Sequence, residues 1–241
     1  MTMFADRADA GRRLARALLH LKPEQPIVLA LPRGGVPVGF EVAKILEAPL
    51  DVLLVRKIGV PGYPELALGA VLDGEHPHLV LNRDLAELAG VGADYIAEQE
   101  AIKLKEIEDR RALYLRGRLR PSLAGRTAIV VDDGVATGAT MKAAIDALRD
   151  MAVRRVVIAV PVAPPETAEM LSAIVDELVC LATPPAFRAI GQFYANFEQT
   201  TDDDVVALLD HASALGFGQK SPRMESSPSA PATRAGTSAR E

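Results

Sequence analysis

The sequence predicts an α/β protein with a doubly wound, mainly parallel sheet, and three observations lead to that prediction. Short apolar runs typical of buried strands alternate with segments whose apolar residues recur at helical spacing. Two of these runs end directly in loops of small residues that open a helix, as happens where a parallel strand leads into its crossover helix. The chain has 241 residues, of which 49% are hydrophobic, which is enough to bury the core of one such domain.

The expected elements follow one another in the order that this fold requires. Strands are expected at 27–31, 50–55, 68–72, 78–81, 128–131, 155–160 and 178–181. Helices are expected at 5–21, from the loop at 32–35 to about Leu46, over a helical insertion at about 84–118, and at 141–151, 166–174 and 202–215. Within the insertion, Glu106 and Arg110 are spaced for an i,i+4 ion pair. Residues 1–217 form one predicted domain with a hood-like segment at about 183–200, and the Ser-, Pro-, Ala- and Gly-rich residues 218–241 form a tail predicted to be disordered.

Composition and charge exclude several classes of partner and site. The net charge is −5 and the folded part has no basic block, so a nucleic-acid-binding surface is not expected. The single cysteine allows no intramolecular disulfide, and the four histidines have no zinc-binding spacing, so no metal site built by the protein alone is expected. Arg12 and Arg13 near the amino terminus are unlike a signal peptide, and no window approaches the ~20 apolar residues of a membrane span. The expectation is a cytoplasmic protein without nucleic-acid or membrane partners.

The central stretch, 128–140, combines a strand, two carboxylates and a loop of small residues. The apolar run ends in Asp132 and Asp133, and residues 136–140 then lead into a helix. Ligands bind at the carboxyl ends of strands in open α/β sheets, and a helix start offers N–H groups to an anion. The small residues therefore suit a phosphate, whereas the two acids, which would repel one, suit the hydroxyls of a sugar. The stretch predicts a ribose 5-phosphate site; the alternative is a strand-end turn in which Thr137 caps a helix.

A second loop with the same placement follows the strand at 27–31. Pro32, Arg33, Gly34 and Gly35 connect that strand to a helix, which brings a guanidinium group together with the N–H groups of a helix start. Such a combination of donors suits a diphosphate. The sequence thus predicts a second anion site, the alternative being a plain turn rich in glycine and proline.

Together the two loops resemble the 5-phosphoribosyl-1-pyrophosphate (PRPP) site of type I phosphoribosyltransferases, and the chain looks most like an uncharacterised stand-alone subgroup of that family. The resemblance implies a Rossmann-like fold in which Asp132 and Asp133 hold the ribose hydroxyls, and it implies a cis peptide bond between Pro32 and Arg33. The residues implied in PRPP binding are Arg33, Gly34, Gly35, Arg56, Lys57, Asp132, Asp133, Ala136, Thr137, Gly138, Ala139 and Thr140. Two of the small residues, Gly134 and Ala139, depart from the family pattern without adding bulk to the loop.

The segment after the strand at 50–55 is expected to be a mobile loop. Arg56 and Lys57 precede a stretch, 59–65, that contains two glycines and two prolines and is therefore expected to be irregular. It resembles the catalytic loop of adenine-type phosphoribosyltransferases. That resemblance implies catalytic roles for Lys57 at the leaving pyrophosphate and for Glu65 at a proton of the base, while the resemblance of the Arg33 loop to the family's pyrophosphate loop implies a catalytic role for Arg33. A plain surface position is the alternative for Glu65.

The hood-like segment concentrates aromatic residues. Residues 183–197 contain four of them in a chain that is 4% aromatic. The spacing from Pro184 to Phe187 weakly resembles a base-binding segment of hypoxanthine-guanine phosphoribosyltransferases, which implies that Phe187 stacks on the base. Core packing is the alternative for Phe193, Tyr194 and Phe197.

The resemblance implies an enzyme, a glycosyltransferase of nucleotide salvage that moves the phosphoribosyl group from PRPP to a nitrogenous base and releases pyrophosphate. Mg²⁺ is the implied cofactor, bound mainly through PRPP and not by a protein cage. Ala136 stands where hypoxanthine-guanine enzymes carry an acidic residue, so the identity of the base stays open. The alternatives are a PRPP-sensing regulatory protein without turnover and a phosphohydrolase. The long helical insertion leaves open a homodimer or a helix that caps the site.

Overall fold

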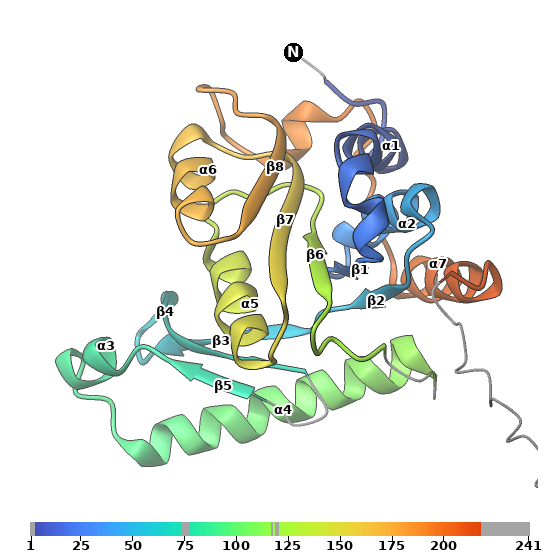
Figure 1. The fold of residues 1–241 in the computed structure, drawn as a ribbon. Helices are drawn as coiled ribbons and strands as arrows, with labels where there is room; N and C mark the ends of the chain where they lie inside the picture. The colour runs from blue at the N-terminus through green and yellow to red at the C-terminus, as the bar shows by residue number, and fades with distance from the viewer. Residues whose placement is uncertain (1–2, 74–77, 117, 119–120, 218–241) are drawn as a thin grey trace, which may run out of the picture.

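The computed structural model describes residues 3–73, 78–116, 118 and 121–217, which form a parallel sheet with helices on both faces and a smaller antiparallel sheet beside it (Figure 1). The first elements are α1 (Arg7–Ala17), a 3₁₀ turn (Leu19–Glu24), β1 (Ile27–Ala30), α2 (Gly35–Leu46) and β2 (Leu50–Val52). The antiparallel sheet and the insertion follow as β3 (Val55–Val60), β4 (Tyr63–Leu72), β5 (His78–Leu81), α3 (Arg83–Leu88) and α4 (Ala93–Leu115). The remaining elements are β6 (Thr127–Val131), α5 (Ala139–Asp150), β7 (Arg155–Val162), α6 (Pro165–Ser172), β8 (Glu177–Ala182), a 3₁₀ turn (Ile190–Phe193) and α7 (Asp202–Ala214).

The main sheet has the strand order β2-β1-β6-β7-β8, and every neighbouring pair is parallel. The chain moves from β1 outward to β2 and later returns to β6 on the other side of β1, so the strand order changes direction between β1 and β6. In open α/β sheets the ligand crevice lies outside the carboxyl ends of the strands at such a switch point. The predicted doubly wound, mainly parallel fold is confirmed, and the two predicted anion loops follow the two strands at its switch point.

The antiparallel sheet β3-β4-β5 corrects two expectations from the sequence. The run 50–55, expected to be one strand, is split because the chain leaves the parallel sheet after β2 and enters the antiparallel sheet at β3. The segment 59–65, expected to be irregular, is a hairpin in which Val60 pairs with Tyr63. Its turn is Pro-Gly with a φ of 78° at Gly62, and proline followed by a glycine of positive φ is what a tight turn of type II needs. The pairing register shifts on either side of Gly59, where β4 carries the additional residues.

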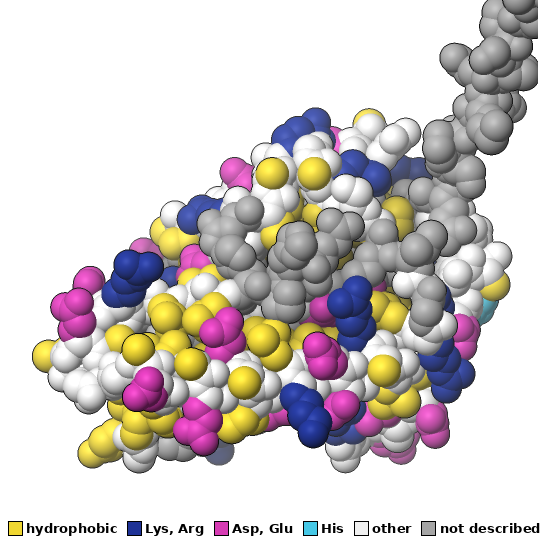
Figure 2. All heavy atoms as spheres, turned by 90° about the horizontal axis from the view of Figure 1, so that it is seen from below, with side chains coloured by type: hydrophobic (Ala, Val, Ile, Leu, Met, Phe, Trp, Pro, Cys, Tyr) yellow, Lys and Arg dark blue, Asp and Glu magenta, His cyan; other side chains and the backbone are white. Residues whose placement is uncertain are grey.

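The helical insertion packs on elements of its own chain. In Figure 1, α4 runs along the base of the molecule beneath the antiparallel sheet toward α7. Ile107 and Tyr114 of α4 join Val205 and Leu209 of α7 in one buried cluster. Figure 2 shows the underside of this view, where hydrophobic side chains lie among acidic and basic ones. The insertion therefore packs against both α7 and the antiparallel sheet.

The prediction of an ion pair between Glu106 and Arg110 within the insertion is wrong. Glu106 instead pairs with Lys103 at 2.6 Å and with Arg56 of β3 at 3.2 Å. Arg110 pairs with Asp202 of α7 at 2.5 Å. Glu106 and Arg110 each bond a residue of a neighbouring element because α4 is packed against β3 and α7.

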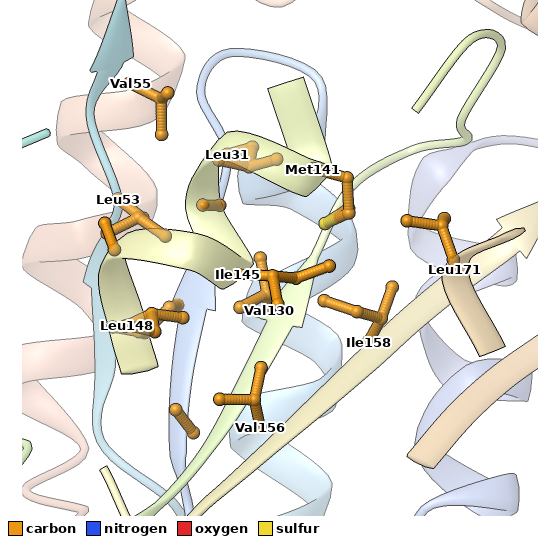
Figure 3. Packing of buried hydrophobic residues seen from close by; sticks show 14 of the residues in the cluster. Leu31, Leu53, Val55, Val130, Met141, Ile145, Leu148, Val156, Ile158 and Leu171 are labelled. Atoms are coloured by element: carbon orange, nitrogen blue, oxygen red, sulfur yellow. The ribbon is translucent and has the colours of Figure 1, made fainter. Parts of the chain in front are cut away.

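The core of the main sheet is buried from both sides. On one face α5 packs Ile145 and Leu148 against Val130 of β6 (Figure 3). On the other face α1 and α2 bury Leu14 and Val38. All five residues of β6 are buried, as is typical of a parallel strand covered on both faces. The strand ends are thus rigid supports for the loops that follow them.

Two further expectations concern the limits of the chain. No helix within the described ranges is both long and apolar enough to cross a membrane. The tail predicted to be disordered, 218–241, lies outside the described residues.

Candidate functional site

The two loops predicted to bind anions touch each other at the carboxyl edge of the main sheet. Leu31 donates its backbone N–H to the carbonyl oxygen of Val131 at 2.9 Å, which joins the ends of β1 and β6. A Cβ atom added to Gly34 would lie 2.1 Å from Oδ2 of Asp133, and one added to Gly35 would lie 2.6 Å from the Val131 carbonyl oxygen. Such contacts are too short for any side chain, so glycine is what lets the loops approach this closely.

The loop between β1 and α2 presents a guanidinium group beside a helix start. The peptide bond between Pro32 and Arg33 is cis, which confirms the prediction. The N–H groups of Gly35 and Val36 are bonded within the loop, to Leu31 and Arg33. The loop can therefore offer a ligand the N–H groups of Arg33 and Gly34 together with the Arg33 guanidinium. That side chain is 37% exposed, and its NH1 lies 4.0 Å from an oxygen of a carboxylate at the start of α7.

The two acids after β6 have different surroundings. Asp133 is 7% exposed, and its Oδ2 accepts a hydrogen bond from Nε of Arg7 at 2.8 Å. Asp132 is partly exposed, and its Oδ1 accepts from the N–H of Asp133 at 2.8 Å. Tyr194 donates its hydroxyl to the carbonyl oxygen of Asp133 at 2.5 Å. Asp132 is therefore the more accessible of the two to a sugar hydroxyl, and Asp133 is the more firmly held.

Arg7 is the residue of this site that the sequence did not indicate, because helical periodicity places it on the polar face of α1. Besides binding Asp133, it donates to the carbonyl oxygen of Glu198 at 2.7 Å and lies 3.9 Å from the centre of the Phe197 ring. A guanidinium bonded to a carboxylate and stacked on an aromatic ring is held in one place. One signal was present: Arg7 begins its helix, where the helix dipole disfavours a cation.

Burial raises the pKa values of both acids. Burial, together with repulsion from Asp133, raises the pKa of Asp132 well above its ordinary range. Burial also raises the pKa of Asp133, although the hydrogen bond from Arg7 lowers it. The pair is thus held in a state that is unfavourable for its charges, as is common where a site is built for a ligand.

Replacing Asp132 by Asn should therefore stabilise the protein at neutral pH. A carboxyl group whose pKa is higher in the folded state contributes stability at low pH, and that contribution is lost as the pH rises through the raised pKa. We expect Asp132→Asn to raise the free energy of unfolding by about 1 kcal/mol and Tm by about 2–4 °C at neutral pH. The gain should vanish toward about pH 4.

Thermal unfolding of both proteins across this pH range measures the effect. Asp109→Asn, at an exposed position of α4, is the control and should leave Tm unchanged. Equal Tm values for wild type and Asp132→Asn at neutral pH would contradict the prediction.

The loop after the acidic pair has a shape that suits a phosphate. Ala136, Thr137 and Thr140 are exposed. Gly138, with a φ of 76°, turns the chain into α5 as its N-cap, a conformation that strains residues with a Cβ. Thr167 of α6 supports the loop from behind by donating its hydroxyl to the carbonyl oxygen of Ala136 at 2.7 Å. The first N–H groups of α5 have no acceptor within the helix, so they and the threonine hydroxyls gather at one helix start.

Arg56 and Lys57 are neighbours in sequence but point to opposite faces of β3, as successive residues of a strand do. Lys57 lines a cavity of about 260 Å³ together with Ala139 and Lys142 of α5. Arg56 instead bonds Glu106 of α4 at 3.2 Å. The structure thus places Lys57 beside Ala139, whereas Arg56 is bonded to Glu106. The PRPP-binding roles of Arg56 and Lys57 stay predictions.

The residues expected to act on a base have separate surroundings. Phe187 is partly buried, and its ring packs against that of Phe193 with centroids 5.2 Å apart. Phe193 and Tyr194 are buried, in agreement with the alternative that they pack in the core. The backbone of Glu65 belongs to β4, whereas its side chain lies outside the described part of the structure. The roles of Phe187 and Glu65 at a base stay predictions.

Comparisons with known proteins agree on one family. Residues 3–198 match the family model described as phosphoribosyl transferase domain. The crystal structure of TT1426 from Thermus thermophilus is 45% identical with a TM-score of 0.79, covering 90% of this chain and 99% of that one. Two curated proteins of Mycobacterium tuberculosis, from strains CDC 1551 and H37Rv, are provisionally named phosphoribosyl transferases and are 51% identical over 212 residues. That match covers 88% of this chain and 47% of each relative, so the chain spans about half the length of the curated relatives it matches.

Proposed function

Because the chain belongs to the phosphoribosyl transferase domain family, we propose that it transfers the 5-phosphoribosyl group of PRPP to a nitrogenous base and releases pyrophosphate. The observation that carries the proposal is the contact between the Arg33 loop and the Asp133 loop at the switch point of the sheet. The Arg33 loop touches Asp133, and the phosphate loop follows the two acids along the chain. PRPP presents a diphosphate, a ribose and a 5-phosphate, which these three groups suit.

In the proposed reaction the bond between C1 of the ribose and the diphosphate oxygen breaks, and its electron pair leaves with the diphosphate. A nitrogen of the base forms the new bond to C1 and loses its proton. The transition state should resemble an oxocarbenium ion, so catalysis rests on holding the ribose and on stabilising the departing negative charge. The products are a nucleoside monophosphate and pyrophosphate.

Each group has a defined task in this scheme. Asp132 and Asp133 accept hydrogen bonds from the ribose hydroxyls, and residues 136–140 enclose the 5-phosphate. Arg33, with the N–H groups of its loop, and Lys57 hold the diphosphate as charge develops on it. Phe187 is the proposed stacking surface for the base, and Glu65 is the proposed acceptor of its proton.

Mg²⁺ is the proposed cofactor. No group of three His, Cys, Asp or Glu side chains in the described part of the chain is placed to hold a metal ion by itself. The partly exposed Asp132 and its neighbour Asp133 nevertheless supply oxygen ligands of the kind Mg²⁺ accepts, and the remaining ligands would be oxygens of PRPP and water. The residues therefore fit an ion shared with the substrate. When bound, it neutralises charge on the diphosphate.

The decisive experiment is a pyrophosphate-release assay with PRPP, Mg²⁺ and a panel of purine and pyrimidine bases. Release that depends on one base supports the proposal and identifies the acceptor. PRPP binding without turnover on any base would assign the protein to PRPP sensing. Absence of PRPP binding would refute both functions.

The cellular setting is proposed on the same basis. A nucleoside monophosphate made from a preformed base places the reaction in nucleotide salvage, and the cytoplasm is the compartment expected for it. A homodimer is also proposed, and sedimentation of the full chain would test it. A monomer over the range of concentrations in which activity is measured would exclude the dimer.

A further inference from the structure

A carboxylate outside the predicted site connects the Arg33 loop to the helical insertion. Asp202 is the first residue of α7, and its Oδ1 accepts hydrogen bonds from NH1 of Arg110 and from the hydroxyl of Tyr114, each at 2.5 Å. Both donors belong to α4. NH1 of Arg33 lies 4.0 Å from the same oxygen. One oxygen atom therefore faces three donors, and the two from α4 are hydrogen-bonded to it.

The difference between these distances decides what Arg33 can do. A separation of 4.0 Å is beyond a hydrogen bond but within reach of electrostatic attraction. Arg33 is thus drawn toward Asp202 without being bonded to it. A guanidinium in close contact with a carboxylate would be lost to a diphosphate, because both anions use the same N–H donors. Because Arg110 and Tyr114 already donate to Oδ1, that oxygen is less available to form a close ion pair with Arg33.

The two α4 donors are themselves fixed in place. The Tyr114 side chain is 1% exposed and belongs to the buried cluster that joins α4 to α7. Arg110 donates a further hydrogen bond to the Tyr114 hydroxyl at 3.1 Å. The hydrogen bond from Tyr114, with the charges of Arg110 and Arg33, lowers the pKa of Asp202, so this group is a carboxylate at neutral pH. The packing of the insertion therefore sets the position of the oxygen that faces Arg33.

We propose that Arg110 and Tyr114 are positioning residues that occupy Oδ1 of Asp202 and so keep the Arg33 guanidinium available to the diphosphate of PRPP. The inference rests on the proposed function and adds to it a task for the helical insertion. Neither residue is required to touch the substrate, since both act on Arg33 through Asp202.

The test is the dissociation constant of PRPP in the presence of Mg²⁺, measured by calorimetry on the full chain. Tyr114→Phe removes one hydrogen bond to Asp202 without a change of charge and should raise the constant about threefold. Arg110→Gln removes the charged donor and should raise it about tenfold. Adding Asp202→Asn to either variant removes the group that captures Arg33 and should return the constant to within about twofold of wild type.

Two controls separate positioning from loss of structure or of charge. Lys105→Gln removes the same charge from an exposed position of α4 and should leave PRPP binding unchanged. Ribose 5-phosphate lacks the diphosphate and should bind equally to every variant, whereas a damaged fold would weaken both ligands. Unchanged PRPP binding in Tyr114→Phe and Arg110→Gln, or a further loss on adding Asp202→Asn, would overturn the inference. A wild-type protein that does not bind PRPP would overturn the proposed function instead.

Discussion

Replacing Thr137 by Asp is expected to abolish PRPP binding. Thr137 is exposed on the loop between β6 and α5, where the proposed 5-phosphate meets the helix start. A carboxylate there would stand about 4 Å from the phosphate, and two like charges at that distance repel by about 4 kcal/mol per unit charge near a protein surface. The dissociation constant should therefore rise at least about thousandfold. Calorimetric titration with PRPP and Mg²⁺ measures it, and pyrophosphate release should disappear with it.

Two variants define what the loss means. Ser122→Asp adds the same charge at an exposed position before β6, at the opposite edge of the sheet, and should leave binding intact. Thr137→Val removes the hydroxyl donor without adding charge and should weaken binding only about tenfold. Unaltered affinity in Thr137→Asp would show that the phosphate binds elsewhere.

Replacing Arg7 by Met should have the largest effect on stability. The variant keeps much of the side-chain volume but leaves the Asp133 carboxylate, which is 7% exposed, without its guanidinium partner. Breaking one half of a buried ion pair costs about 3 kcal/mol, which for a domain of this size lowers Tm by roughly 6–12 °C. Arg7 lowers the pKa of Asp133, so its removal raises that pKa further. The deficit should therefore shrink as the pH falls and Asp133 becomes protonated.

Chemical unfolding at neutral and acidic pH checks this prediction. Arg12→Met on the same helix is the matched control, because its guanidinium is 44% exposed and 3.9 Å from Glu41, and its effect should stay below about 0.5 kcal/mol. Adding Asp133→Asn to Arg7→Met should restore most of the lost stability, since no buried charge then remains unpaired. Equal losses of unfolding free energy in the two arginine variants would mean that the ion pair with Asp133 contributes no more to stability than an exposed one.

The fold could be predicted because its signals are local. β1, β6 and β7 are apolar runs buried on both faces, and the small-residue loops after β1 and β6 mark where a parallel strand turns into a helix. The two loops could be placed at one edge for the same reason, since parallel neighbours end together. The cis bond after Pro32 was predicted from family resemblance and is present.

The features that could not be predicted from the sequence depend on contacts between distant parts of the chain. Arg7 looks like any polar residue of an amphipathic helix until Asp133 and Phe197 are placed beside it. The different neighbours of Arg56 and Lys57 could not be predicted without knowing that residues 55–60 form a strand, in which successive side chains point to opposite faces. Glycine and proline suggested an irregular loop at 59–65, yet Pro61 and Gly62 form the two-residue turn of a hairpin whose register shifts at Gly59.

The contacts between the first residues of the domain and residues 194–198 have a consequence for folding during synthesis. Phe4 bridges to Tyr194, and Arg7 reaches the carbonyl oxygen of Glu198, 191 positions along the chain. A ribosome adds about 5–20 residues per second, so several seconds separate the synthesis of Asp133 from that of Phe197 and Glu198. During that interval the nascent chain already has the Asp133 carboxylate but lacks the ring and the carbonyl oxygen that hold Arg7 against it. The arrangement of Arg7 against Asp133 is therefore completed late in biosynthesis, when the segment with Phe197 and Glu198 closes a loop of 191 residues.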